Sequence, residues 1–146
     1  MCGDDGGDGG GSDDGIYVLH VDDDPGILDV TAAFLERRDD LRVLTAGDAA
    51  EGLSMLGAER VDCIVSDYDM PGRDGFAFHE AVRDRGVDCP FILYTGHEDI
   101  ARAVPDGIDD ALLKDAGTEQ YEALARRIRE TVERDGTRVA TGAGIE

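Results

Sequence analysis

Short apolar runs alternate along this chain with longer amphipathic stretches. Five runs have the length and composition of buried strands, and they lie at residues 16–21, 41–46, 61–66, 91–94 and 111–113. The stretches between them repeat apolar residues at helical spacing, as Leu28, Thr31 and Leu35 do after the first run. This alternation predicts an α/β fold, a doubly wound five-stranded parallel sheet with helices on both faces.

Local signals place several helix ends. Asp24 offers an N-cap and Pro25 a first helical position, and Thr118 can cap the last helix. The helix after the fourth strand is expected to be short, because Pro105 cannot continue it. We predict a shortened fourth helix of about two turns that ends near Val104, with little buried surface and a correspondingly mobile outer face.

Composition divides the chain into three parts. Residues 1–15 are acidic and glycine-rich and predict a flexible tail. Residues 16–135 contain all the periodic segments and form one predicted domain. Residues 136–146 predict a second flexible tail, and these few residues are too short to form an output domain.

The net charge of −20 comes from 34 acidic against 14 basic residues, spread over the whole chain. Such a surface repels nucleic acid, so we expect no nucleic-acid partner. No apolar run approaches a membrane span, and the N-terminus lacks the pattern of a signal peptide. We therefore expect a cytoplasmic protein without membrane contact, and the acid-rich composition is similar to that of cytoplasmic proteins from halophilic archaea.

A particular set of polar residues follows the strands. Asp22 and Asp23 come after the first strand, Asp67 after the third, Thr95 after the fourth and Lys114 after the fifth. The carboxyl ends of parallel strands meet at one edge of a sheet, where such folds bind ligands. We therefore expect these five side chains to converge in one crevice.

The chemistry of this set suits phosphoryl transfer. Clustered carboxylates favour Mg²⁺, a hard cation that binds oxygen ligands. An aspartate can attack phosphorus and carry an aspartyl phosphate, and a threonine hydroxyl can donate a hydrogen bond to a phosphoryl oxygen. The chain has one lysine, Lys114, and thirteen arginines. The single lysine indicates a site that needs the compact charge of an ammonium group rather than the planar guanidinium group of arginine.

Four segments together resemble the receiver domain of two-component response regulators. In chain order they read "VLHVDDDPGIL", "IVSDYDMPGRDG", "ILYTG" and "LLKD". The resemblance extends from about Ile16 to Asp135. It implies a CheY-like fold, with the flavodoxin-like strand order 2-1-3-4-5.

The resemblance also implies roles for the crevice. Asp67 would accept a phosphoryl group from a sensor histidine kinase or a phosphotransfer domain. Asp22, Asp23 and Asp67 would bind the cofactor Mg²⁺, with the backbone carbonyl of Asp69 as a further ligand. The Thr95 hydroxyl would act as a switch.

Three further implications concern the surroundings of the phosphoryl group. Lys114 would sense the phosphoryl group, and the output would be altered contact with a downstream protein. Asp69 and His97 would flank the group and tune its hydrolysis, although His97 is equally consistent with a solvated residue at a helix start.

Two positions depart from the family pattern. Receivers usually carry Tyr or Phe three residues before the lysine and proline directly after it. Here these residues are Ala111 and Asp115. A cis bond before a non-proline residue costs about 2.5–4 kcal/mol, so we expect the bond before Asp115 to be trans.

Two other functions stay open on the sequence. Asp67 and Asp69 have the spacing of an Mg²⁺-dependent phosphohydrolase with an aspartyl nucleophile, and the fold could serve as an unphosphorylated scaffold. We expect instead a single-domain regulator, or a piece of a longer protein. Such a regulator is not an enzyme beyond its own phosphorylation and dephosphorylation.

High salt should stabilise the protein. Self-repulsion among 34 acidic residues opposes folding at low ionic strength, and added salt screens it. We expect the melting temperature to rise by roughly 5 °C or more between dilute buffer and molar KCl. An unchanged melting temperature would contradict the comparison with halophile proteins.

Overall fold

A computed structural model describes residues 15–114 and 117–144, the last ten of them as backbone alone. Five strands form one sheet, all paired in parallel, in the order β2-β1-β3-β4-β5. The strands are β1 Ile16–Val21, β2 Leu41–Ala46, β3 Cys63–Ser66, β4 Phe91–Thr95 and β5 Asp110–Leu113. The predicted fold class and strand order are therefore confirmed.

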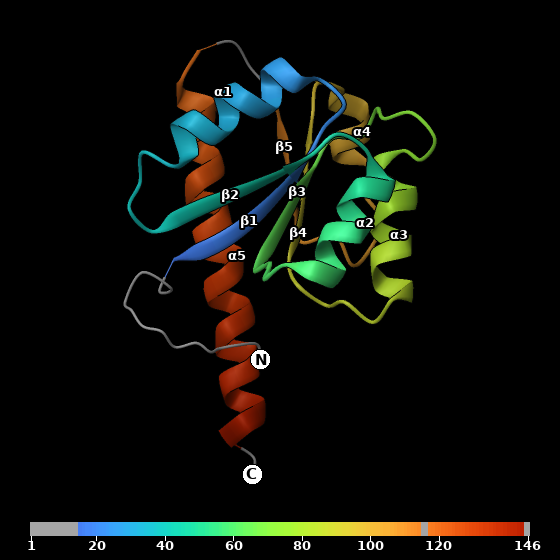
Figure 1. Cartoon of the computed structure of the whole chain (residues 1–146). Helices are drawn as coiled ribbons and strands as arrows, with labels where there is room; N and C mark the ends of the chain where they lie inside the picture. Colours follow the sequence, from blue (N-terminus) through green and yellow to red (C-terminus); the bar gives the residue numbers. More distant parts are fainter. Residues whose placement is uncertain (1–14, 115–116, 145–146) are drawn as a thin grey trace.

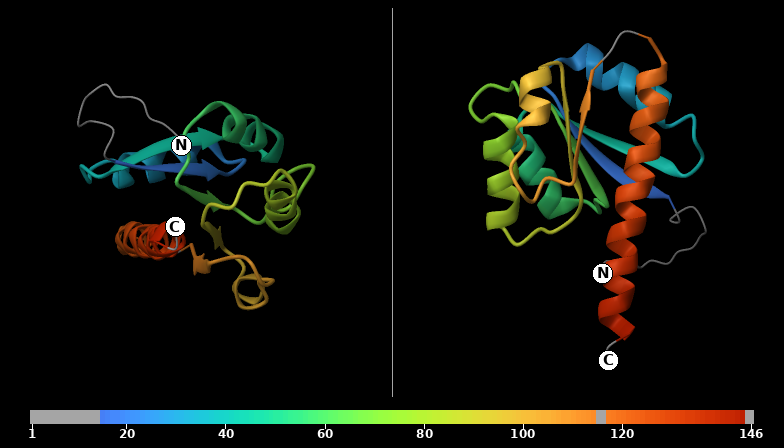
Figure 2. Two further views of the ribbon diagram at one scale, coloured as in Figure 1. Left: turned by 90° about the horizontal axis from the view of Figure 1, so that it is seen from below. Right: turned by 180° about the vertical axis from the view of Figure 1, so that it is seen from behind.

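Helices cover both faces of the sheet (Figure 1). They are α1 Pro25–Leu35, α2 Ala49–Ala58, α3 Gly75–Asp84, α4 Glu98–Arg102 and α5 Glu119–Gly144. The views of Figure 2 show α1 and α5 on one face of the sheet and α2, α3 and α4 on the other. No helix of the described ranges combines the length and the apolar run that crossing a membrane requires.

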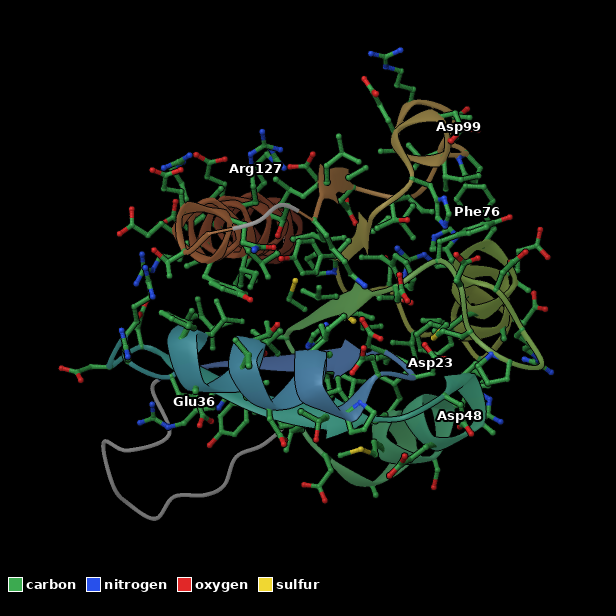
Figure 3. The ribbon with its side chains drawn as sticks, turned by 90° about the horizontal axis from the view of Figure 1, so that it is seen from above. Asp23, Glu36, Asp48, Phe76, Asp99 and Arg127 are labelled. Atoms are coloured by element: carbon green, nitrogen blue, oxygen red, sulfur yellow. The ribbon has the colours of Figure 1, made fainter. Side chains whose placement is uncertain are left out.

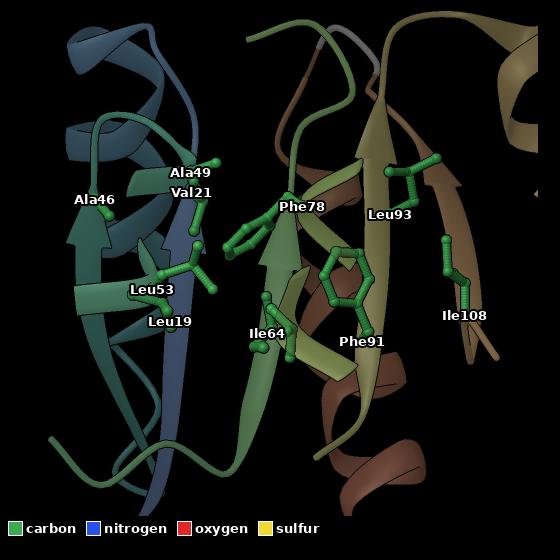
Figure 4. Packing of buried hydrophobic residues seen from close by; sticks show 11 residues of the cluster. Leu19, Val21, Ala46, Ala49, Leu53, Ile64, Phe78, Phe91, Leu93 and Ile108 are labelled. Atoms are coloured by element: carbon green, nitrogen blue, oxygen red, sulfur yellow. The ribbon is translucent and has the colours of Figure 1, made fainter. Parts of the chain in front are cut away.

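Two apolar layers hold these helices, because neighbouring side chains of a strand point to opposite faces. Leu19 and Val21 of β1 belong to the layer under α2 and α3, together with Phe78 and Phe91 (Figure 4). The opposite layer, under α1 and α5, includes Cys63 of β3, which is fully buried as expected of a core residue.

The predicted start of α1 is confirmed. The carboxylate of Asp24 accepts the backbone N–H groups of Gly26 at 2.9 Å and of Ile27 at 3.3 Å. Pro25 occupies the first helical position, where its missing N–H leaves no hydrogen bond unmade.

The fourth helix is short, as predicted, but with five residues it makes about one and a half turns rather than two, and it ends two residues before Val104. It begins at Glu98 and ends at Arg102, and none of its residues is buried. Pro105 follows, and Gly107 adopts a φ of +99°, which turns the chain back toward β5. The predicted mobility of this segment stays a prediction.

The last helix extends into the predicted C-terminal tail, because α5 continues through 136–144. The predicted flexibility of residues 136–146 stays a prediction. A single glycine such as Gly136 costs a helix only about 1 kcal/mol relative to alanine, and no proline follows it. Residues 145–146 and the predicted tail over 1–14 lie outside the described residues.

Gly75, the first residue of α3, allows the chain before this helix to pack closely against the end of β3. A methyl group at Gly75 would lie 2.6 Å from the backbone oxygen of Asp67 and 2.9 Å from Leu93. We expect Gly75→Ala to lower the free energy of unfolding by roughly 2 kcal/mol, measured by urea titration. Gly57→Ala is the control, because nothing lies within 4 Å of that position, and it should gain about 0.5–1 kcal/mol. A stable Gly75→Ala protein would contradict the packing described here.

Candidate functional site

The strand register brings the predicted side chains to one edge of the sheet. Val21 of β1 lies opposite Ser66 of β3, so the next residues along the two strands, Asp22 and Asp67, are neighbours. Both carboxylates are almost completely buried. Figure 3 looks down on this edge and labels Asp23, which lies between the end of β1 and the start of α1.

Lys114 reaches the same place from β5. Its backbone N–H donates to the carbonyl of Thr95 at 2.8 Å, which extends the pairing of β4 and β5. The ammonium Nζ lies 2.9 Å from Asp22 Oδ2 and 3.2 Å from Asp67 Oδ1. The structure thus joins three of the residues that the sequence assigned to one crevice.

Burial and mutual charge decide the protonation of this cluster. Burial, followed by the charge of Asp22, raises the pKa of Asp67, against the opposing effect of Lys114. For Lys114, burial alone would lower the pKa. The hydrogen bond and charge of Asp22, together with Asp67, outweigh it and raise the pKa. The ammonium therefore stays charged and compensates part of the carboxylate charge.

A divalent cation could compensate the carboxylate charge that Lys114 leaves uncompensated. Asp22, Asp23 and Asp67 each offer a carboxylate oxygen, and these oxygens lie within 4.8 Å of one another. Two of the three residues are buried and one is exposed, which leaves room for water on one side. An all-oxygen set of this kind suits Mg²⁺. The predicted contribution of the Asp69 carbonyl stays a prediction.

The two residues predicted to flank the phosphoryl group contact each other. The imidazole Nε2 of His97 lies against the carboxylate of Asp69, and both side chains are more than half exposed. His97 also precedes α4 as its N-cap residue, without a side-chain capping bond. The contact joins the loop after β3 to the start of α4.

The side chain of Thr95 is fully buried at the end of β4. Its hydroxyl oxygen accepts the backbone N–H of His97 at 3.1 Å. Among the described residues, no hydrogen bond joins this hydroxyl to Asp67. The predicted switch residue thus lies beside the site, with its oxygen engaged by the chain that leads to α4.

A buried aromatic residue beside Lys114 was missed by the sequence analysis. The Lys114 Nζ lies 5.7 Å from the centre of the Tyr94 ring, and the Tyr94 hydroxyl donates to the side-chain oxygen of Gln120 on α5. The sequence signal was the tyrosine itself, since a buried tyrosine hydroxyl requires a partner. In the sequence, Tyr94 ends the apolar run 91–94, which predicts burial of its ring but names no partner for its hydroxyl.

His20 lies near this ring, at 6.3 Å between ring centres. No described residue forms a hydrogen bond with either of its ring nitrogens. Burial and the nearby Lys114 lower the pKa of His20 to about 3, so the imidazole is neutral at physiological pH.

Comparison with known proteins agrees with this geometry. The family model described as the response regulator receiver domain matches residues 18–141. The chain belongs to this family. The CheY-like resemblance noted in the sequence is thereby confirmed.

Relatives of this receiver occur in plants and in prokaryotes. Two-component response regulator ARR10 of Arabidopsis thaliana is 30% identical over 137 residues, which cover 89% of this chain and 24% of that protein. The chain spans a quarter or less of the length of the curated relatives it matches.

Solved structures are similar over nearly their whole length. The CheY-like receiver domain protein of Methanospirillum hungatei is 25% identical, has a TM-score of 0.73, and is matched over 85% of this chain and 98% of that one. TrrA of Thermotoga maritima, determined in complex with Mg²⁺-BeF, is 21% identical with a TM-score of 0.68, over 77% and 98% of the two chains.

Of the two departures from the family pattern, the structure describes Ala111. Ala111 lies in β5 opposite Leu93 of β4 and packs against the layer under α2 and α3. A small side chain therefore stands where receivers usually carry a ring. Asp115, with its expected trans bond, lies outside the described residues.

The crowding of carboxylates predicts a stabilising substitution. Asp67→Asn keeps the shape of the side chain and removes a buried charge that Asp22 opposes. In metal-free buffer at neutral pH, we expect the free energy of unfolding to rise by roughly 1 kcal/mol, measured by urea titration.

The pH dependence of this gain has a definite sign. Because folding raises the pKa of Asp67, the wild type recovers stability as pH falls through that pKa, and its difference from the variant shrinks. Asp29→Asn, at an exposed position of α1, is the control for loss of one negative charge. A variant less stable than the wild type would contradict the account of the cluster.

Proposed function

We propose that this receiver accepts a phosphoryl group on Asp67 from a phosphohistidine of a sensor histidine kinase or phosphotransfer domain. The geometry of one carboxylate supports the proposal most directly. Asp67 ends a central strand, its Oδ1 lies 3.2 Å from the Lys114 ammonium, and two further aspartates offer oxygens within 4.8 Å. These are the parts that in-line transfer to a carboxylate requires.

In the proposed transfer, an Asp67 carboxylate oxygen forms a bond to phosphorus as the bond from phosphorus to the donor's imidazole nitrogen breaks. The nitrogen leaves with the bonding electron pair. Asp22 and Asp23, with Asp67, would hold Mg²⁺, which when bound neutralises charge on the phosphoryl oxygens. Lys114 supplies a second positive charge at fixed position, because Asp22 holds its ammonium at 2.9 Å.

Release of the phosphoryl group requires attack by water. We propose that the exposed pair formed by Asp69 and His97 controls the approach of that water, because these residues follow Asp67 and Thr95 by two positions and contact each other. The proposed output is a change in contact with a downstream protein.

We also propose that this protein works in the cytoplasm of a halophilic archaeon. The net charge of −20 and the single lysine support that setting, because added salt screens the repulsion that such a charge creates.

Incubation with acetyl phosphate and Mg²⁺ tests the function. Intact mass spectrometry should detect one phosphoryl adduct on the wild type and none on Asp67→Asn, because the amide is no longer a nucleophile. Asp29→Asn should form the adduct like the wild type, and chelation of Mg²⁺ should suppress it.

The other two functions predict different results. A phosphohydrolase would turn over many phosphate esters in the same mixture, and a scaffold would show neither an adduct nor turnover. An adduct that persists in Asp67→Asn would refute the assignment of Asp67.

A further inference from the structure

Tyr94 directly precedes the buried Thr95 and lies on the face of the sheet opposite to Ala111. In the register of β4 and β5, Leu93 pairs with Ala111 and Tyr94 with Leu112. Ala111 packs toward α2 and α3, whereas Tyr94 belongs to the layer under α1 and α5. The large aromatic ring beside this site is therefore on the α5 side of the sheet.

The ring of Tyr94 contacts the site through Lys114. The ammonium lies 5.7 Å from the ring centre, within the range of a cation–π interaction. The same ammonium holds Asp22 and Asp67. Any change of charge at Asp67 therefore alters the balance of attractions on a group that also contacts Tyr94.

The hydroxyl of Tyr94 contacts α5. It donates to Gln120 Oε1, and the Gln120 side-chain nitrogen donates to the carbonyl of Gly117 at 2.8 Å. Gly117 has a φ of +106° and lies in the turn before α5. Lys114, one tyrosine ring and the first turn of the longest helix thus form a continuous series of contacts.

Tight packing makes this series suitable for transmitting a displacement. Tyr94 is only 2% exposed and shares its layer with Leu124, Ala125 and Ile128 of α5. A ring packed to this density cannot shift without moving its neighbours. By contrast, α4 contributes no buried residue, so the sheet holds it less firmly.

We propose that Tyr94 and Gln120 transmit the phosphorylation state of Asp67 from Lys114 to the start of α5. The inference rests on the proposed function, since it needs a phosphoryl group at Asp67. New phosphoryl oxygens attract the ammonium and change its position over the Tyr94 ring. The ring and its hydrogen bond to Gln120 then bias the first turn of α5 between two arrangements.

Hydrogen exchange of residues 117–125 tests this route, measured in Mg²⁺ with and without acetyl phosphate. Intact mass spectra of the same samples report the adduct on Asp67 independently. In the wild type, we expect adduct formation to change the exchange rate of this segment roughly fivefold, the effect of one net hydrogen bond. In Gln120→Ala and in Tyr94→Phe, which removes only the hydroxyl, the change should fall below about twofold.

Tyr121→Phe is the matched control. It removes a tyrosine hydroxyl one residue after Gln120, from a ring that stacks on Phe34 of α1 instead, and it should keep the wild-type response. An adduct without any response of residues 117–125 in the wild type would overturn the inference alone. So would a full response in both Gln120→Ala and Tyr94→Phe. Absence of any adduct in the wild type would overturn the proposed function and the inference with it.

Discussion

The Lys114 ammonium lies between two buried carboxylates, and the geometry of the whole edge of the sheet depends on that contact. Asp22 and Asp67 end neighbouring strands and would repel each other without a cation between them. Lys114 comes from the far strand β5, yet its Nζ reaches Asp22 at 2.9 Å and Asp67 at 3.2 Å. The contact therefore fixes the ends of three strands at once, and a shift of register in any of them would leave a buried charge unpaired.

Both faces of the sheet bury polar side chains among the described residues. Under α2 and α3, the imidazole of His79 lies edge-on against Phe91, and its Nε2 is 3.2 Å from the carbonyl oxygen of Gly107. On the α1 and α5 side, the buried polar groups are His20, the hydroxyl of Thr31, Tyr94, and Thr131 beside the Cys63 thiol. A buried polar group that forms a hydrogen bond, as the Tyr94 hydroxyl does, fixes a particular contact. A buried polar group without a hydrogen bond costs free energy. On each face, a buried polar side chain therefore adds a specific contact to the apolar packing.

The sequence predicted the parts of this structure that depend on order along the chain. Strand ends determine which residues meet at the carboxyl edge, so the positions of Asp22, Asp67 and Lys114 could be predicted. Contacts between distant loops or helices could not be predicted, because the separation of two residues along the sequence does not give their distance in the fold. The hydrogen bond from Tyr94 to Gln120 depends on how α5 lies against the sheet. The extension of α5 to Gly144 was not predicted, because residues 136–144 carry little of the apolar periodicity that marks the first part of the helix.

The burial of Lys114 also affects the covalent chemistry of the protein. No other side chain in the sequence carries an ε-amine, so an acyl group transferred to a lysine can go only to this site. Acylation would remove the positive charge between Asp22 and Asp67 and place a bulky amide among carboxylates. The same ammonium is only 20% exposed and is held by both acids, which protects it from reagents that modify surface lysines. Any modification of the single ε-amine of this chain would therefore be a change within the acidic cluster itself.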